Sequence, residues 1–284
     1  MAESPPSTAR LRKIGRTLRQ IREEAGLTLN AAGRRIERSG SSLSLIEKGT
    51  QLLRLRDLKH ILDVYDVDPD THHALMTLAA QQHQQGWWDD FKDTIPADAL
   101  DYTSLENDAT HLDAFEMGFI PGLLQTEDYA RSIVRSDLEE AQTSKMDGFL
   151  AFRMRRQQIL DRSAPPRLRL VIDEAALRRT RGGRTVMREQ LFKLLDDSQR
   201  QHITVQVLPF SCREDPGVTA TFWMLDVGRP PILSSVLITH LTGRLHLEGK
   251  ADLERYSAAF DRLRTSALTE PDSQSLIKRL VSDL

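Results

Sequence analysis

The sequence predicts a multidomain protein: an all-α bundle of five short helices, followed by a mixed α/β (α+β) domain. Its 284 residues correspond to about two domains, because a domain typically has roughly 150 residues. Residues 1–60 hold 13 of the 39 basic and 6 of the 41 acidic residues, so this segment has a net charge of +7 and the remainder −9. Helical periodicity occupies the first part of the chain, whereas alternating apolar residues appear only later. We therefore predict domains at 10–82 and 87–284.

The composition argues against several classes of protein. The single cysteine, Cys212, rules out an intramolecular disulfide and a thiol-rich metal cluster, which is typical of a reducing cytoplasm. No apolar run approaches the ~18 residues of a membrane span, and residues 1–9 contain no stretch typical of a signal peptide. His72 and His73 are adjacent and cannot share a helix face with His83 at ligand spacing, so no metal site is predicted. We predict a cytoplasmic protein that has no cofactor and does not bind a membrane.

The charge asymmetry points to a polyanionic partner for one end of the molecule. A basic N-terminal segment on an acidic body is suited to DNA, because neutralising phosphates supplies the sequence-independent part of the affinity. The alternative is a solvated basic helix without a partner.

The first predicted helix begins at Leu11 and ends at Gly26. Its apolar residues recur at steps of three and four, which defines one face of a helix. The arginines of this segment fall largely off that face. The apolar residues are Leu11, Ile14, Leu18, Ile21 and Ala25, and the arginines are Arg12, Arg16, Arg19 and Arg22.

A second helix is predicted from Thr28 to about Ile36. The Thr28 hydroxyl is a good N-cap, since it can accept a hydrogen bond from an unpaired N–H of the first turn. Ala31, Ala32 and Gly33 are small, as required where another helix crosses at close range in a helix-turn-helix.

The third predicted helix, residues 41–48, follows a turn at 37–40 and is ended by Gly49. Leu43 and Ile46 stand three apart and face inward, so the serines, Leu45 and Lys48 lie on the other sides. Two further helices are predicted at 52–64 and 68–84. Five short helices, with the third directly after a tight turn, are the plan of a small DNA-binding bundle.

These segments resemble the Xre or lambda-repressor-like helix-turn-helix regulators. The resemblance implies that residues 28–35 form the positioning helix and residues 41–48 the recognition helix in the major groove. Two positions depart from the family pattern: Glu37 replaces the usual turn glycine, and Leu45 stands where many members have Arg or Lys. The residues that carry the resemblance are Gly15-Arg16-x-Leu18-Arg19-x-Ile21-Arg22-Glu23-x-Ala25-Gly26-Leu27-Thr28 and Ser44-Leu45-Ile46-Glu47-Lys48-Gly49.

The predicted contacts to DNA are of three kinds. Serine hydroxyls of the third helix can reach base edges or phosphates, although each could instead cap the helix or be solvated. Leu45 suits a thymine methyl group or makes no contact, and Lys48 and Arg54 suit phosphates. Glu47 is expected to pair with a nearby arginine and to stabilise the turn. The complete predicted set is Thr28, Asn30, Ser39, Ser41, Ser42, Ser44, Leu45, Lys48 and Arg54.

The second half begins after a polar linker at 81–86. The Trp87-Trp88 pair is costly to leave in water, so it is expected to dock the second domain or to start a new core; a stacking platform for a ligand is the alternative.

The second domain is predicted to mix helices and strands. Helices are predicted from Thr126 and over 146–160, 174–179, 185–200, 253–263 and 273–284. The predicted strands are a parallel pair at 168–172 and 203–207, and further strands at 220–227, 232–241 and 244–247, the last two joined through Thr242-Gly243.

This half contains the motifs Pro121-Gly122-Leu123-Leu124-Gln125-Thr126, Arg153-x-x-Arg156-Gln157, Ile172-Asp173-Glu174-Ala175-Ala176-Leu177-Arg178 and Val205-Gln206-Val207-Leu208-Pro209-Phe210. With these motifs it resembles the domain of unknown function found behind Xre-type modules in actinobacterial, antitoxin-like regulators. The resemblance implies a dimeric transcriptional regulator that is sometimes adjacent to a small partner protein.

The favoured function is a sequence-specific, homodimeric regulator of transcription that binds double-stranded DNA. Its second domain would dimerise and would sense a small-molecule effector or a small protein encoded nearby. Asp173, Glu174 and Arg178, at the end of a strand, are candidates for an effector or domain-docking site together with Trp87 and Trp88, although the two acids could simply cap the next helix. The alternative function is a DNA-tethered enzyme whose second domain acts on a nucleotide or small phosphate.

Overall fold

The computed structural model describes residues 8–82, 86–137, 145–212, 217–240 and 243–284. The chain divides into two compact units. The first unit contains Met1–Asp90, Pro96–Ser104 and Arg229–Leu233, and the second contains Phe91–Ile95, Leu105–Gly228 and Ser234–Leu284. The predicted linker at 81–86 and the predicted turn at Thr242-Gly243 include residues 83–85 and 242, which lie outside the described residues.

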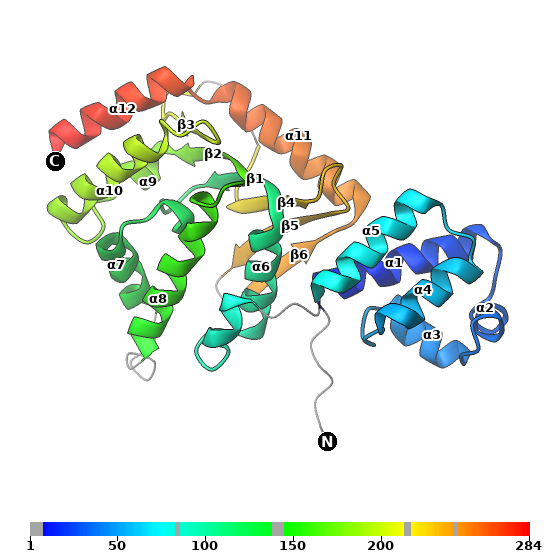
Figure 1. Ribbon diagram of the computed structural model, residues 1–284. Coiled ribbons are helices and arrows are strands. Elements are labelled where there is room, and N and C mark those ends of the chain that lie inside the picture. The colour runs from blue at the N-terminus through cyan, green and yellow to red at the C-terminus, as the bar shows by residue number, and fades with distance from the viewer. Residues whose placement is uncertain (1–7, 83–85, 138–144, 213–216, 241–242) are drawn as a thin grey trace. The chain divides into compact units, whose positions relative to one another are not determined.

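The first unit is a bundle of helices, as the periodicity predicts (Figure 1). Its third helix begins at Gly40, one residue earlier than predicted, because Ser39 is the N-cap. Its fourth helix begins at Leu55 instead of 52, because Arg54 has the extended backbone of an N-cap residue. The helices are α1 (Ala9–Glu24), α2 (Leu29–Arg35), α3 (Gly40–Glu47), α4 (Leu55–Val64) and α5 (Pro69–Gln82).

The core of this bundle consists of aliphatic side chains from successive helices. Leu18 of α1 and Leu43 of α3 are completely buried. The other buried aliphatic residues of this core include Ile46, Leu58, Ile61, Leu62 and Leu78. One expectation was wrong: Arg22 does not lie off the apolar face but is buried, with 7% of its surface exposed.

The second unit contains a six-stranded mixed sheet in the order β3-β2-β1-β4-β5-β6. β1 pairs in parallel with β2 and antiparallel with β4, and β2 pairs in parallel with β3, which confirms the predicted parallel pair. The central strand β1 was not predicted. The strands are β1 (Ala109–Glu116), β2 (Arg167–Asp173), β3 (Ile203–Leu208), β4 (Phe222–Val227), β5 (Leu233–His240) and β6 (Gly243–Leu247).

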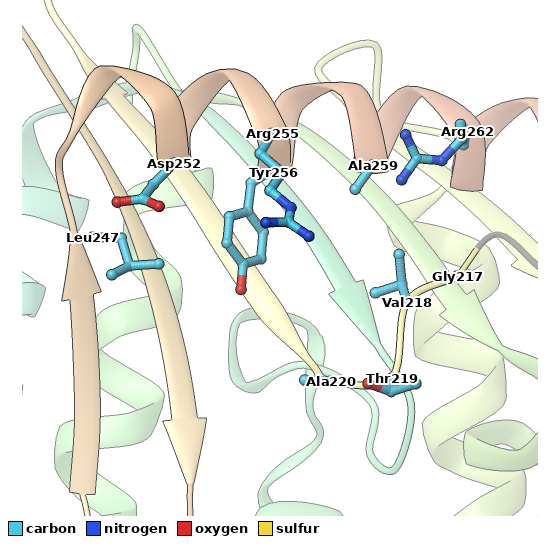
Figure 2. A pocket seen from close by; sticks show the side chains of 10 residues that line it. All are labelled: Gly217, Val218, Thr219, Ala220, Leu247, Asp252, Arg255, Tyr256, Ala259 and Arg262. Carbon is cyan, nitrogen blue, oxygen red and sulfur yellow. The ribbon is translucent and has the colours of Figure 1, made fainter.

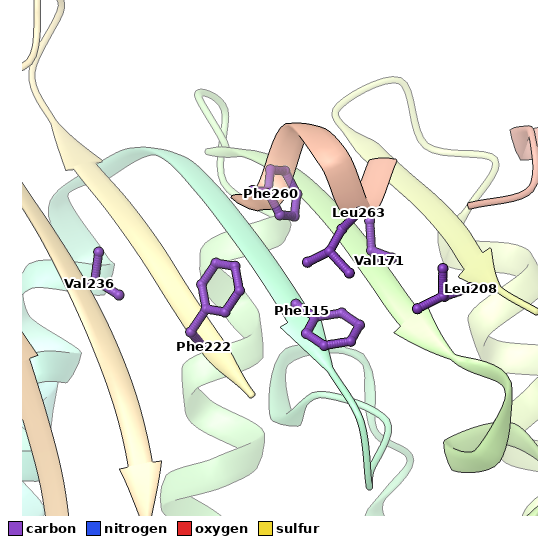
Figure 3. Packing of buried hydrophobic residues seen from close by; sticks show 7 residues of the cluster. All are labelled: Phe115, Val171, Leu208, Phe222, Val236, Phe260 and Leu263. Atoms are coloured by element: carbon purple, nitrogen blue, oxygen red, sulfur yellow. The ribbon is translucent and has the colours of Figure 1, made fainter. Parts of the chain in front are cut away.

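Helix α11 (Lys250–Ser266) covers one face of this sheet (Figure 1). Phe115 of β1 and Phe222 of β4 point from the strands towards Phe260 and Leu263 of the helix (Figure 3). The Phe222 and Phe260 ring centroids are 6.4 Å apart at an interplanar angle of 81°, the edge-to-face arrangement that aromatic pairs favour.

The remaining helices complete the second half of the chain. Most lie where they were predicted, whereas α6 was not predicted. They are η1 (Trp87–Phe91), α6 (Ala97–Asp108), η2 (Gly122–Leu124), α7 (Glu127–Asp137), α8 (Met146–Gln157), η4 (Gln158–Leu160), α9 (Glu174–Arg178), α10 (Arg184–Asp197) and α12 (Glu270–Asp283). Among the described residues, none of the helices combines the length and apolar character needed to cross a membrane.

Candidate functional site

Helix α3 is delimited at both ends by its own sequence. The Ser39 hydroxyl oxygen accepts a hydrogen bond from the Ser42 backbone N–H at 3.1 Å, so it satisfies one of the unpaired donors of the first turn. Gly49 follows the helix at a φ of +67°, in the left-handed region that glycine adopts without steric cost. The helix is therefore short, and its own residues Leu43 and Ile46 are buried on its inner face.

Close packing of α1 against the end of α3 fixes the position of α3. A Cβ atom added to Gly15 would lie 2.5 Å from the carbonyl oxygen of Ile46 and 2.6 Å from that of Glu47. Both obstacles are backbone atoms, so a larger residue would displace the whole turn rather than a flexible side chain. Gly15 therefore sets the distance between α1 and α3.

We expect Gly15→Ala to destabilise the first unit by about 1–3 kcal/mol, the usual cost of overpacking. This cost should exceed the gain in helix propensity of roughly 1 kcal/mol from replacing glycine by alanine. Hydrogen exchange of peptides from α1 and α3 in increasing urea would measure the change. Gly118→Ala is the matched control, because a Cβ there meets nothing within 4 Å. Unchanged protection in the Gly15 variant would contradict the packing argument.

A buried ion pair joins the same two helices. Arg22 of α1 donates from Nε to Glu47 Oε1 at 2.6 Å and from Nη2 to Oε2 at 2.8 Å, and its Nη1 donates to the Leu27 carbonyl at 2.8 Å. The hydrogen bond and charge of Glu47 raise the pKa of Arg22 above its usual value, against the opposing effect of burial. The predicted pairing of Glu47 with a nearby arginine is confirmed.

The turn between α2 and α3 has a left-handed residue despite the absence of glycine. Glu37 has a φ of +55°, a conformation that costs a non-glycine residue free energy. Next to it, Arg38 Nη2 donates to Asp57 Oδ2 of α4 at 3.0 Å, and the Arg38 N–H donates to the Gly33 carbonyl at 2.8 Å. These bonds hold the turn in place. Thr28 caps α2 as predicted, its hydroxyl accepting from the Ala31 N–H.

The outward face of α3 presents small hydroxyls, one leucine and one lysine. Ser41 and Lys48 are exposed, Ser44 is half-buried, and 48% of Leu45 is exposed. Ser42 differs, since its hydroxyl donates to Gln51 Oε1 at 3.3 Å and is thereby partly engaged within the protein.

The other predicted DNA-binding residues flank this face. Asn30 is exposed on α2, and its side-chain oxygen lies against Gly40, where a Cβ would collide with it. Arg54 is exposed just before α4. The structure therefore brings α2, α3 and the start of α4 together within one unit.

Sequence reasoning missed three residues that position this surface: Gly15, Gln51 and the buried Arg22. Gly15 lies within the segment that resembles the regulators, so its motif position was a usable signal. The Ser42–Gln51 contact spans nine residues across a helix end, and periodicity gives no indication of it.

Among the candidate effector residues, Asp173 and Glu174 are already engaged in hydrogen bonds within the protein. Asp173 Oδ1 accepts from the Ala175 N–H at 2.8 Å, so it caps α9. Glu174 is buried and accepts from Arg178 Nε at 2.7 Å and from the Phe210 N–H at 2.8 Å. Trp87 and Trp88 are half-buried in a 3-10 helix of the first unit, with ring centroids 6.0 Å apart in an edge-to-face arrangement.

A second buried carboxylate lies at the end of β1. Glu116 accepts from Trp223 Nε1 at 2.8 Å and from the Thr221 hydroxyl at 3.4 Å. Burial raises the pKa of Glu116 to about 7, although these two hydrogen bonds and the charge of Arg153 act in the opposite direction.

The second unit also contains a hollow beside α11 (Figure 2). Its volume is about 370 Å³, and Arg255, Tyr256 and Arg262 of α11 face Leu247 of β6 and the segment at Val218 across it. Among the described residues, no group of three His, Cys, Asp or Glu side chains is arranged to hold a metal ion.

Comparison with protein families assigns both halves of the chain. Residues 13–75 match the model described as helix-turn-helix domain, and residues 99–279 match the model described as domain of unknown function (DUF5753). The chain belongs to the DUF5753 family. The helix-turn-helix match supports a DNA-binding regulator, and the DUF5753 match covers the sheet of the second unit. Comparison with curated proteins and with solved structures found no match.

Proposed function

We propose that this protein is a sequence-specific transcriptional regulator that acts as a dimer in the cytoplasm, with α3 in the major groove of double-stranded DNA. Within the helix-turn-helix proteins we place it with the Xre-type, antitoxin-like regulators. The observation that carries the proposal is the outward face of α3, a short helix held from behind by Gly15 and the Arg22–Glu47 pair. A helix of roughly 10–12 Å diameter fits a major groove about 12 Å wide, and the fixed backbone holds the reading face in one orientation.

In the proposed complex, Ser41 and Ser44 contact base edges and Leu45 contacts a thymine methyl group, because short side chains allow the helix to approach closely. Lys48 and Arg54 neutralise phosphates. Thr28 and Ser39 contact the backbone of DNA, since a capping hydroxyl still has a proton to donate, and Asn30 contacts it through its side-chain amide N–H groups. Ser42 contributes least, because Gln51 already accepts from it.

Dimerisation follows from the small reading surface. One eight-residue helix reads only a few base pairs, and two half-sites about 34 Å apart restore specificity. We assign DNA binding to residues 10–82, and dimerisation and the sensing of an effector or a partner protein to residues 87–284. Asp173 and Glu174 are both engaged in structural hydrogen bonds, which favours this assignment over a catalytic role for that cluster.

The test is footprinting of the full chain on DNA upstream of its own and adjacent genes at two salt concentrations. We expect a two-fold symmetric footprint. The triple variant Ser41→Ala, Ser44→Ala, Lys48→Ala should lose at least about tenfold in affinity, which corresponds to roughly 1.4 kcal/mol. Its dependence on salt should flatten by about one unit of slope per DNA-bound helix, because Lys48 is the only charge removed.

The matched control is the double variant Lys250→Ala, Ser257→Ala on α11, where both residues are exposed. This variant also removes a lysine and a serine hydroxyl, and its DNA affinity should be unchanged. Undiminished binding by the triple variant would show that α3 is not the reading helix. Binding without sequence preference would refute specific recognition while leaving a general affinity for DNA.

A further inference from the structure

A hollow of about 480 Å³ lies at the carboxyl ends of two neighbouring parallel strands of the second unit. Glu174 directly follows β2, and Pro209, Phe210 and Ser211 directly follow β3, while α12 supplies the opposite wall. In open sheets, ligands bind in crevices outside the carboxyl ends of parallel strands. The volume falls within the range of roughly 300–1,000 Å³ that is usual for small-molecule sites.

The polar part of this hollow is preorganised by a buried carboxylate. Glu174 is 6% exposed and accepts hydrogen bonds from Arg178 Nε and from the Phe210 N–H. The positive charge of Arg178 compensates the negative charge of Glu174, and their hydrogen bond orients the guanidinium group of Arg178, whose Cζ lies 5.9 Å from the Phe210 ring centroid. Its terminal N–H groups remain able to donate to a ligand.

A second guanidinium group lines the same hollow from α12. Arg279 is exposed, and it forms no ion pair or hydrogen bond with any residue in the part of the chain that the structure describes. Planar guanidinium groups recognise carboxylates and phosphates through paired hydrogen bonds. Asp283 is also on the wall, and its negative charge opposes a bound anion.

The apolar part of the hollow combines one exposed aromatic ring with buried leucines. Phe210 is 63% exposed, whereas Leu276 and Leu280 of α12, on the opposite wall, are 6% and 5% exposed. An exposed aromatic ring beside buried leucines offers a surface that an apolar group of a ligand would cover.

We propose that this hollow binds a small amphipathic anion, with its carboxylate or phosphate on Arg178 and Arg279 and its apolar part against Phe210 and α12. This inference rests on the proposed function, to which it adds the site and the chemical class of the effector. Carboxylate and phosphate share the recognition chemistry, and the experiment distinguishes them.

The test is calorimetric titration of the full chain with phenylpropionate, phenylpropyl phosphate and the neutral phenylpropionamide. At least one anion should bind at least about tenfold more tightly than the amide, the gain expected from a charge-assisted hydrogen bond. Which of the two binds more tightly identifies the head group. Equal affinity of the amide and both anions, or no binding of either anion, would overturn the proposal.

Variants locate the binding to this hollow. Arg279→Gln and Phe210→Ala should each weaken the preferred anion at least about tenfold, and Asp283→Asn should strengthen it by removing repulsion. Arg178 is left unchanged, because its loss would leave Glu174 buried without its partner. Arg255→Gln, an exposed arginine in the other hollow (Figure 2), is the control and should bind as the unmodified chain does. An effect of Arg255→Gln equal to that of Arg279→Gln would refute this location.

A DNA-binding assay with and without the preferred anion separates the two proposals. If the anion changes the affinity for DNA and Arg279→Gln abolishes this change, both the hollow and the proposed function are supported. Ligand binding located by the variants, in a chain that shows no specific DNA binding, supports the hollow and refutes the proposed function. Specific DNA binding with no binding of either anion refutes the hollow alone.

Discussion

Glu47→Ala is expected to destabilise the first unit by about 3–5 kcal/mol and to abolish specific DNA binding. The substitution removes both short hydrogen bonds of the buried Arg22 guanidinium group and leaves it only a 3.3 Å contact with the exposed carboxylate of Glu23. A buried charge that loses its buried partner is costly. The side chains of Arg22 and Glu47 are only 9% and 5% exposed, so water does not replace the lost partner. Hydrogen exchange of peptides from α1 and α3 as a function of urea would measure the loss in this unit.

Two further variants make this experiment specific. Glu47→Gln keeps the shape of the side chain and one hydrogen-bond acceptor, so this variant should lose less stability than Glu47→Ala. Asp63→Ala removes an exposed partner of Lys59 in α4, where the two side chains are 51% and 59% exposed, and it should leave exchange in α3 unchanged. Equal effects of Glu47→Ala and Asp63→Ala would show that burial of the Arg22–Glu47 pair has no energetic consequence.

The second large effect is a dependence of stability on pH that originates at Glu116. The folded chain holds this proton up to about pH 7, whereas an unfolded carboxyl group releases it near its ordinary value of 4.5. Between these values the folded state binds more protons than the unfolded state, so the free energy of unfolding decreases as pH rises. The contribution is fully present below 4.5 and absent above about 7, and it amounts to about 3 kcal/mol at roughly 1.4 kcal/mol per pKa unit.

Urea unfolding at about pH 5 and about pH 8 would measure this contribution in the second unit. Glu116→Gln mimics the protonated form and should lose this part of the pH dependence, with the gain in stability appearing at the higher pH. Glu254→Gln, an exposed residue of α11, is the control and should follow the unmodified chain. Parallel pH profiles for the Glu116 variant and the unmodified chain would contradict the assignment.

The helices of the first unit were predictable because local signals agree with their tertiary positions. Thr28 and Ser39 cap the helices that they precede, and Gly26 and Gly49 have the positive φ that ends a helix. The interior position of Arg22 was not predictable from periodicity, because burial of an arginine depends on a partner 25 residues away.

The strand β1 was missed because its polar residues do not follow a simple alternation. His111 and Asp113 alternate with Leu112 and Ala114, but Phe115 and Glu116 reverse this alternation, and the last three residues of the strand are all buried. Asp113 is tolerated there because Arg169, its register partner on β2, donates to it from Nε at 2.6 Å. The compensating charge lies 56 residues further along the chain, so no local window contains it.

The same strand affects the order in which the protein folds. β1 is complete only when β2 and β4 have paired with it, and its contacts Asp113–Arg169 and Glu116–Trp223 span 56 and 107 residues. The pair that joins α1 and α3 spans only 25. Long loops close at a greater entropic cost, and folding rates fall as contacts become more distant along the chain. During synthesis, we therefore expect the proposed DNA-binding half to reach its native state before the half that would regulate it.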